Sequence, residues 1–183
     1  PKVYGDVGFA ITTVDMLDGN SNRCGVYRIE LFVDGLQVYG QRMDRLDFAT
    51  NRAMNAHTIY ERFKKDRSSI HGSYRLPGNP LDIYDNLVND GVISFRDGKT
   101  HACEYRLLDI MGNESRVKFS VQSLTAPGKP MPSKAHLAHW DWERDNAIET
   151  ERVRISMKAN TLYENLDLDI TETTKIANSV GPA

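Results

Sequence analysis

Three groups of residues in this 183-residue chain carry side chains that could bind a metal ion. His57 and Glu61 stand four residues apart, so a helix would place both on one face. No third ligand is evident beside them, and a polar pair on the surface is the simpler interpretation. His136, His139 and Asp141 gather two imidazoles and a carboxylate, a set that can bind zinc adventitiously. The flanking prolines favour the end of a linker over a built metal site.

A third group spaces the oxygen ligands of Asp18, Asn20 and Asn22 at alternate positions, as calcium loops do. An EF-hand also requires Gly at its sixth position and Glu at its twelfth, where this chain has Arg23 and Ile29. A connecting turn rich in Asn and Gly is therefore the preferred interpretation. Weak calcium binding stays open as an alternative.

Aromatic side chains supply the remaining candidates for a binding site. Trp140 and Trp142 stand two residues apart, so a strand would place both on one face, where they could stack on sugar rings. Tyr60 is a third candidate for a ligand or partner contact, whereas Tyr84 is expected in the core. Core packing and ligand binding both stay open for the two tryptophans.

The sequence offers no catalytic residue, because it lacks a Gly-x-Ser-x-Gly motif and a glycine-rich phosphate loop. It has 23 basic and 25 acidic residues and no long basic run, so no nucleic-acid partner is expected. No apolar run is long enough to span a bilayer, so no transmembrane segment is expected either. The chain opens at Pro1 without Met, which favours a fragment or a processed product.

Alternating side chains predict that residues 27–33 and 36–43 form a hairpin around Asp34 and Gly35, which tolerate positive φ. Cys103 alternates with apolar neighbours and is expected to be a buried thiol, although one bridge to Cys24 stays open. Further strands are expected at residues 9–14, 92–95, 101–108 and 116–121, the second and third of these forming a hairpin around Asp97 and Gly98. Short strands separated by Gly-containing turns predict a β-sandwich.

Small and aromatic residues recur every three or four positions from Ala49 to Phe63, which predicts a short helical insertion near residues 49–65 that lies across the sandwich. Asp47 or Thr50 could cap this helix. Four Pro and Gly residues mark residues 124–135 as a linker, after a first domain spanning 1–123.

The C-terminal residues 136–183 alternate like strands at 153–157 and 166–170 but offer few other core candidates. They are interpreted as an incomplete second β segment. An unpaired strand there could pair with a second copy of the chain to form a homodimer.

An ordered set of motifs resembles the region that follows the catalytic domain in lysostaphin/LytM-type zinc peptidases of Gram-negative envelope proteins. Residues 5–121 carry most of the resemblance, and residues 159–166 continue it. The motifs are Gly25-Val26-Tyr27-Arg28-Ile29-Glu30-Leu31-Phe32-Val33-Asp34-Gly35, Met43-Asp44, Thr50-Asn51-Arg52-Ala53-Met54-Asn55, Pro77-Gly78-Asn79, Asn89-Asp90-Gly91 and Leu108-Asp109-Ile110-Met111-Gly112-Asn113-Glu114-Ser115. The turn at 109–113 is also common in bacterial immunoglobulin-like domains. The resemblance implies a periplasmic or outer-membrane-associated setting and a parent protein that cuts peptidoglycan cross-links. The β-sandwich predicted from the strand spacing is expected to be immunoglobulin-like.

The zinc motifs of these peptidases, a His followed four residues later by Asp and a separate His-x-His, are missing from this sequence. The residues four positions after the five histidines are Glu61, Arg75, Tyr105, Trp140 and Glu143. No catalytic residue, metal ligand or cofactor is therefore assigned to this segment, and zinc is expected only in a separate catalytic domain.

The leading hypothesis is a non-catalytic accessory module that positions or regulates a peptidase domain of the same protein, or anchors it to peptidoglycan or envelope proteins. A carbohydrate- or peptidoglycan-binding module is the alternative. It predicts that Trp140 and Trp142 are exposed side by side. A stand-alone hydrolase ranks last.

Overall fold

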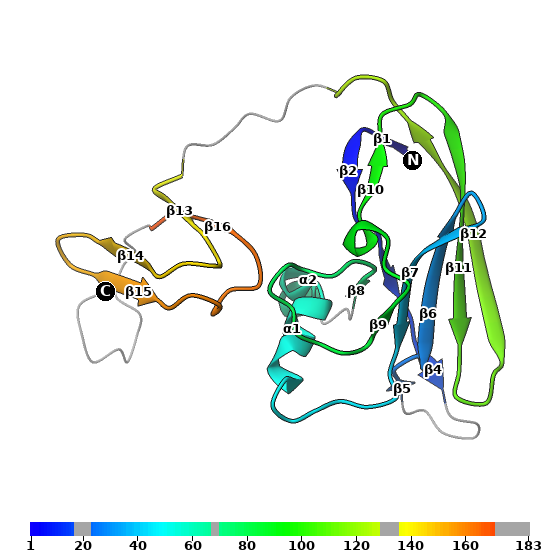
Figure 1. Cartoon of the computed structure of the whole chain (residues 1–183), viewed down its shortest axis with the longest axis horizontal. Helices are drawn as coiled ribbons and strands as arrows, with labels where there is room; N and C mark the ends of the chain where they lie inside the picture. The colour runs from blue at the N-terminus through cyan, green and yellow to red at the C-terminus, as the bar shows by residue number, and fades with distance from the viewer. Residues whose placement is uncertain (17–22, 67–69, 129–135, 171–183) are drawn as a thin grey trace. The chain divides into compact units, whose positions relative to one another are not determined.

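The computed structural model describes residues 1–16, 23–66, 70–128 and 136–170 of a chain that is mainly β (Figure 1). The chain divides into two units, Pro1–Pro130 and Met131–Ala183. No helix in the described ranges is long and apolar enough to cross a membrane.

The first unit is built on one six-stranded sheet. Its neighbouring strands are antiparallel except for one pair at one edge, which is parallel. In spatial order its strands are β1 (Lys2–Val3), β12 (Glu114–Ser123), β11 (Thr100–Leu108), β6 (Arg28–Val33), β7 (Leu36–Arg42) and β9 (Tyr84–Asp85). β11 lies in the middle and pairs with β6 on one side and β12 on the other. It therefore determines which residues of three strands share a face.

The hairpin predicted for residues 27–43 is confirmed as β6 and β7. Asp34 and Gly35 connect the strands with φ values of 51° and 83°, the positive values that a two-residue hairpin turn needs. The β11–β12 hairpin also forms, and its turn is closed by Asp109. One carboxylate oxygen of Asp109 accepts the N–H groups of Met111 and Asn113, both at 2.8 Å.

The expected hairpin between residues 92–95 and 101–108 is wrong. β10 (Ile93–Phe95) pairs antiparallel with β2 (Gly5–Val7) and belongs to a separate two-stranded sheet. Both edges of β11 are already occupied, so β10 has no place beside it. The Asp97 N–H donates to Ser123 Oγ at 3.0 Å, which fixes the turn where the chain crosses between the two sheets.

Small sheets cover one face of the large sheet and close the core. β3 (Ala10–Thr12) pairs with β8 (Ile70–Gly72), and β4 (Asp15–Met16) pairs with β5 (Arg23–Cys24), so the strand expected at 9–14 forms in part. Phe9 packs edge-on against Phe95 and Phe119, with ring centroids 6.1 and 5.7 Å away. The buried residues of this core are Ile29, Leu31, Val33, Val38, Tyr39, Phe95, Cys103, Tyr105 and Val121. Cys103 is a free thiol, as is Cys24.

The helical insertion forms in three short pieces rather than as one helix. They are a 3₁₀ turn (Asn51–Ala53), α1 (Met54–His57) and α2 (Tyr60–Asp66). The chain is extended at Thr58, where it bridges to β8, and the Ile59 N–H donates to the Ile70 carbonyl at 2.9 Å. These tertiary bonds interrupt the helical pattern. The Thr50 side chain caps nothing, whereas an Asp47 carboxylate oxygen accepts the Ala49 N–H at 3.0 Å.

The second unit consists of two antiparallel ribbons. β13 (Ala138–Trp140) pairs with β16 (Leu166–Leu168), and β14 (Asn146–Glu149) pairs with β15 (Arg154–Met157). The strands expected at 153–157 and 166–170 correspond to β15 and β16. Among residues 136–170, only Trp140 is a buried hydrophobic side chain. The remainder of the expected linker, residues 129–135, lies outside the described residues.

Gly91 offers a direct test of the first unit's packing. It has a φ of +82°, and a Cβ built there would lie 2.5 Å from the Ser73 carbonyl oxygen. We expect Gly91→Ala to lower the free energy of unfolding by about 2–4 kcal/mol, because left-handed strain and steric overlap add together. Gly25→Ala is the matched control, since nothing lies within 4 Å of its Cβ position. Urea unfolding measures both, and equal stabilities would contradict the packing described here.

Candidate functional site

The face of the large sheet opposite the core carries a network of charged side chains. Because side chains alternate, Phe32 on β6, Glu104 on β11 and Lys118 on β12 share one cross-strand row on this face. Arg106 and Arg116 stand in the next row. None of these residues was a candidate for a binding site in the sequence. These residues come together through the strand register, which the sequence does not reveal. The alternation of charged and apolar residues along the strands does indicate that this face is polar.

Glu104 is the centre of this network. Its carboxylate lies 2.6 Å from Arg106 Nε, 3.3 Å from Lys118 Nζ and 3.6 Å from Arg116 Nη1. The hydrogen bond from Arg106, and then the one from Lys118, lower the pKa of Glu104. Its side chain is only 17% exposed although it lies on the outer face, so its neighbours largely enclose it.

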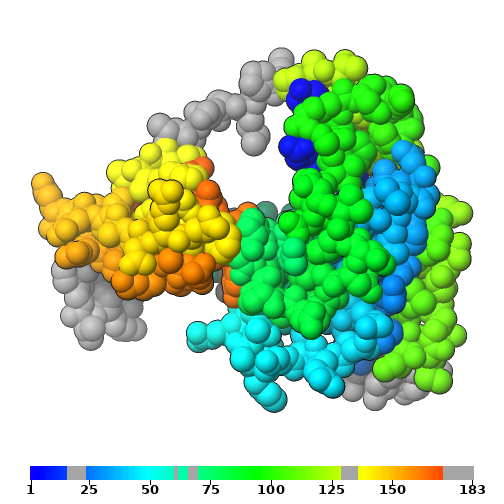
Figure 2. All heavy atoms as spheres, in the orientation of Figure 1, coloured from blue at the N-terminus to red at the C-terminus, as the bar shows by residue number. Residues whose placement is uncertain are grey.

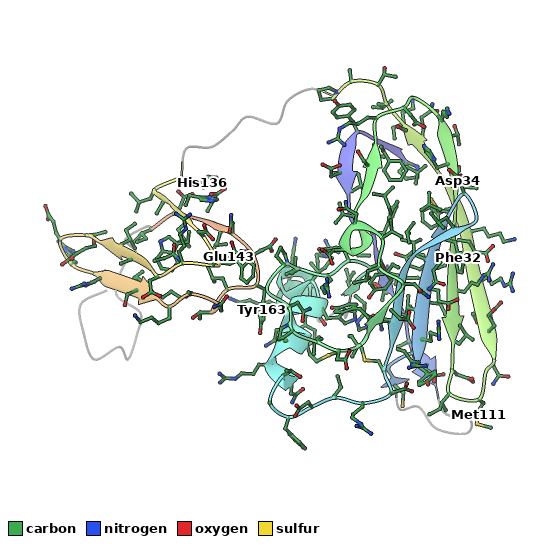
Figure 3. The ribbon with its side chains drawn as sticks, in the orientation of Figure 1. Phe32, Asp34, Met111, His136, Glu143 and Tyr163 are labelled. Carbon is green, nitrogen blue, oxygen red and sulfur yellow. The ribbon has the colours of Figure 1, made fainter. Side chains whose placement is uncertain are left out.

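A shallow hollow opens beside this network. Its volume is about 240 Å³, and its lining includes Phe32, Gly35, Ala102, Glu104, Arg106 and Lys118. The Arg106 guanidinium carbon lies 4.2 Å from the centroid of the Phe32 ring, a cation–π contact. Figure 3 shows Phe32 on β6, next to the hairpin turn that holds Asp34.

A second polar group is buried between the helical insertion and the large sheet. His57 is 1% exposed, and the Tyr84 hydroxyl lies 3.3 Å from its Nδ1. Asn79 donates to the same hydroxyl at 2.9 Å, so Tyr84 can donate its own proton to His57. The His71 ring packs against His57 with centroids 5.2 Å apart. This cluster attaches α1 to β8 and β9.

Burial, and then the neighbouring His71, lower the pKa of His57 to about 3. The buried Nε2 of His57 has no hydrogen-bond partner within the described ranges. Burial also lowers the pKa of His71. Both rings are therefore neutral near pH 7, and protonation opposes the packing of the insertion.

His101 has the opposite electrostatic setting. Its Nδ1 lies 2.6 Å from Asp34 and its Nε2 lies 3.1 Å from Asp97, so it joins the β6–β7 turn to the turn before β11. These two hydrogen bonds, the one to Asp34 first, raise the pKa of His101. The Lys99 N–H, followed by His101, lowers the pKa of Asp97 to about 2.

The aromatic candidates do not form one platform. Trp140 is 3% exposed at the end of β13, while Trp142 is partly buried in the turn that follows. The side-by-side exposure of the two tryptophans that a carbohydrate-binding module predicts is therefore not found, because Trp140 is buried. Tyr60 begins α2, and its side chain lies outside the described residues. Tyr84 is partly buried and packs against Tyr39, with ring centroids 6.0 Å apart.

The candidate metal ligands are also separated. His57 enters the core, and the side chain of Glu61 lies outside the described residues, as does the segment 17–22 that holds the calcium-like spacing. His139 Nδ1 lies 2.6 Å from Asp167 on the paired strand β16, so its partner is Asp167 and not Asp141. His136 lies 3.5 Å from Asp169. Across the described ranges, no three His, Cys, Asp or Glu side chains form a group that could hold a metal ion.

Two loops at one end of the large sheet expose apolar side chains. Leu108, Arg28 and Arg42 form one cross-strand row, so the β11–β12 turn and the segment after β7 leave the sheet within about 10 Å of each other. The exposed fractions are 45% for Leu46, 96% for Phe48, 78% for Ile110 and 83% for Met111. We call these four residues the apolar loop end. Figure 2 shows the segment after β7, in cyan, projecting from the first unit.

The buried imidazole predicts a stability that falls in mild acid. The folded pKa of His57, about 3, lies below its unfolded value near 6.5, so the unfolded state binds more protons as pH falls below about 6.5. Between pH 7.5 and pH 5, His57 should therefore remove about 2 kcal/mol of unfolding free energy. His71 acts in the same direction, whereas the stabilisation from His101, with its raised pKa, is fully present in acid and lost as pH rises.

His57→Gln isolates this contribution. Urea unfolding of both proteins at the two pH values should show that the variant has lost about 2 kcal/mol of the acid-induced destabilisation, whatever its stability at neutral pH. His139→Gln, whose side chain is 62% exposed, is the control. Identical pH dependence of the wild type and His57→Gln would contradict a neutral, buried ring.

The comparisons with known proteins identify no family for this chain: no family model matches it, and neither the curated proteins nor the solved structures give a significant match.

Proposed function

We propose that this chain is a non-catalytic accessory module of a larger envelope protein that resembles the LytM-type peptidoglycan metallopeptidases. It positions or regulates a neighbouring peptidase domain, or holds it against an envelope partner, in a periplasmic or outer-membrane-associated setting. The sequence motifs support the family, and the apolar loop end supports the contact role. Zinc belongs to the catalytic domain and not to this segment.

The proposal includes an immunoglobulin-like sandwich for the first unit. The order β12-β11-β6-β7 corresponds to the G-F-C-C′ order of variable-type immunoglobulin sheets. The small sheets that pack on the core face supply the second layer. The helical insertion follows β7, where a sandwich of this kind tolerates a long connection.

The apolar loop end carries the proposal. Single exposed apolar residues are ordinary, but Phe48, Ile110 and Met111 are all largely exposed on two loops that leave the same end of the sheet, which makes these loops the best candidates for a protein contact. Sandwich folds commonly bind through loops at one end of a rigid scaffold. The histidines that could do chemistry serve the fold instead, since His57 attaches the insertion and His101 joins two turns.

A carbohydrate- or peptidoglycan-binding module is the second candidate. Burial of Trp140 removes the tryptophan pair that first suggested it, but the hollow on the outer sheet face offers a different site. Pairing of the C-terminal strand with a second copy stays a prediction.

The loop end can be tested in the full-length protein by measuring muropeptide release from purified peptidoglycan. We expect the double variant Phe48→Ser with Met111→Ser to slow release at least about fivefold, because loss of two contact residues costs more than about 1 kcal/mol. Leu36→Ser is the matched control. Leu36 is 62% exposed, but it lies at the opposite end of the sheet, beside the Asp34 turn (Figure 3).

The isolated chain should release no muropeptides, with or without added Zn²⁺. Zinc-dependent release by the isolated chain would overturn the non-catalytic assignment. Equal rates for the double variant, the Leu36→Ser control and the wild type, at equal folded stability, would remove the contact role from the apolar loop end.

A further inference from the structure

We infer that the hollow on the outer sheet face binds a small carboxylate-bearing ligand about the size of one sugar ring. The inference rests on the proposed function as a non-catalytic module, and it assigns that module a second, ligand-binding surface. The volume of the hollow, about 240 Å³, is just below the range of roughly 300–1,000 Å³ that holds drug-sized molecules. A single ring with one substituent fits this space.

The depth of the hollow comes from two small residues. Gly35 and Ala102 have almost no side chain to fill the outer face, while Phe32 and the stems of Arg106 and Lys118 stand around them. Asp34 does not line the hollow, and its carboxylate accepts the Ala102 N–H at 2.9 Å and lies 2.6 Å from His101. The floor is therefore apolar, and it suits the C–H face of a ring.

The rim carries an excess of positive charge. Among the residues that line the hollow, Arg106 and Lys118 carry two positive charges and Glu104 carries one negative charge, which leaves a balance of +1. The Lys118 side chain is 71% exposed and reaches into solvent above the hollow. An anionic group on the ligand would complete this balance.

Arg106 is held ready for a carboxylate. Its Nε donates to Glu104, and the ring of Phe32 lies under the guanidinium, so two contacts fix the plane of the group before any ligand arrives. A guanidinium has five N–H donors, and the bond to Glu104 uses one of them. A fork held in this way binds a carboxylate at a lower entropic cost than a free side chain would. Phe32 is thus a positioning residue, while Arg106 and Lys118 contact the ligand.

The test is an NMR titration of the whole chain with glucuronate and with glucose, which matches it in ring size but has no charge. We expect glucuronate to shift the amide signals of Gly35, Ala102 and Lys118 with a Kd of about 1 mM. Glucose should bind at least about fivefold more weakly, since it lacks the pairs with Arg106 and Lys118. The preference should shrink in about 0.5 M NaCl, because the rim is open to solvent.

Lys118→Ala and Arg106→Gln should each abolish the preference for glucuronate, and the exposed Lys118 can be replaced without disturbing the core. Lys64→Ala removes the same charge from α2 and should change nothing. Phe32→Leu keeps an apolar side chain at the edge of the hollow but releases Arg106, so it should reduce the preference without abolishing the binding of glucose.

Three outcomes would overturn the inference. They are equal shifts with glucose and glucuronate, a preference that survives in Lys118→Ala, and no shift at Gly35 or Ala102 at about ten times the expected Kd. Each would leave the proposed accessory role intact, because that role is measured by muropeptide release through Phe48 and Met111 at another part of the first unit.

Discussion

The alternation of side chains along β11 is the constraint on which the rest of the first unit depends. β11 hydrogen-bonds to β6 and β12 at once, so its register fixes the facing residues of three strands. Cys103 and Tyr105 point into the core, while Ala102, Glu104 and Arg106 occupy the outer face. A slip of one residue would exchange the two sets and bury the charges, which is far too costly to be populated.

Each face of β11 then connects to a different polar group. On the inner face, the Tyr105 hydroxyl lies 2.7 Å from Ser73 Oγ, at the end of the strand that also holds His71. On the outer face, Glu104 gathers cations from both hairpin strands. The inner polar groups fix the insertion, whereas the outer ones stay accessible to a ligand. The alternation of side chains along β11 therefore separates the polar groups that hold the fold together from those that can bind a ligand.

Local signals in the sequence predicted the parts of the fold that depend on neighbouring residues. Asp34 and Gly35 identify the β6–β7 turn because positive φ favours these residue types. The partner of β10 could not be predicted, since pairing with residues near the N-terminus leaves no mark in the spacing of Ile93–Phe95. The break at Thr58 was missed for the same reason, because a bridge to β8 replaces the helical bond.

The candidate sites show a similar limit. Histidines at short spacing were the candidate metal ligands in the sequence, but His57 is buried in the core and His139 lies beside Asp167. The hollow depends on Phe32, Glu104 and Lys118, which stand 72 and 14 residues apart and meet only through strand register. Trp140 was left open between core and surface. The sequence of the second unit contains few apolar residues that could form a core. Trp140 is the buried hydrophobic residue among its described residues.

Thiol reactivity tests the two-faced β11 most directly. In a Cys24→Ser background, the native Cys103 should react with a disulfide reagent only on unfolding, because it is 3% exposed and burial raises its pKa to about 11. With Cys103 also changed to Ala, a thiol introduced by Ala102→Cys should react in the folded protein at close to the rate of an exposed cysteine. Rapid labelling of Cys103 in the folded chain, or protection of the thiol at position 102, would contradict the assignment of the inner and outer faces.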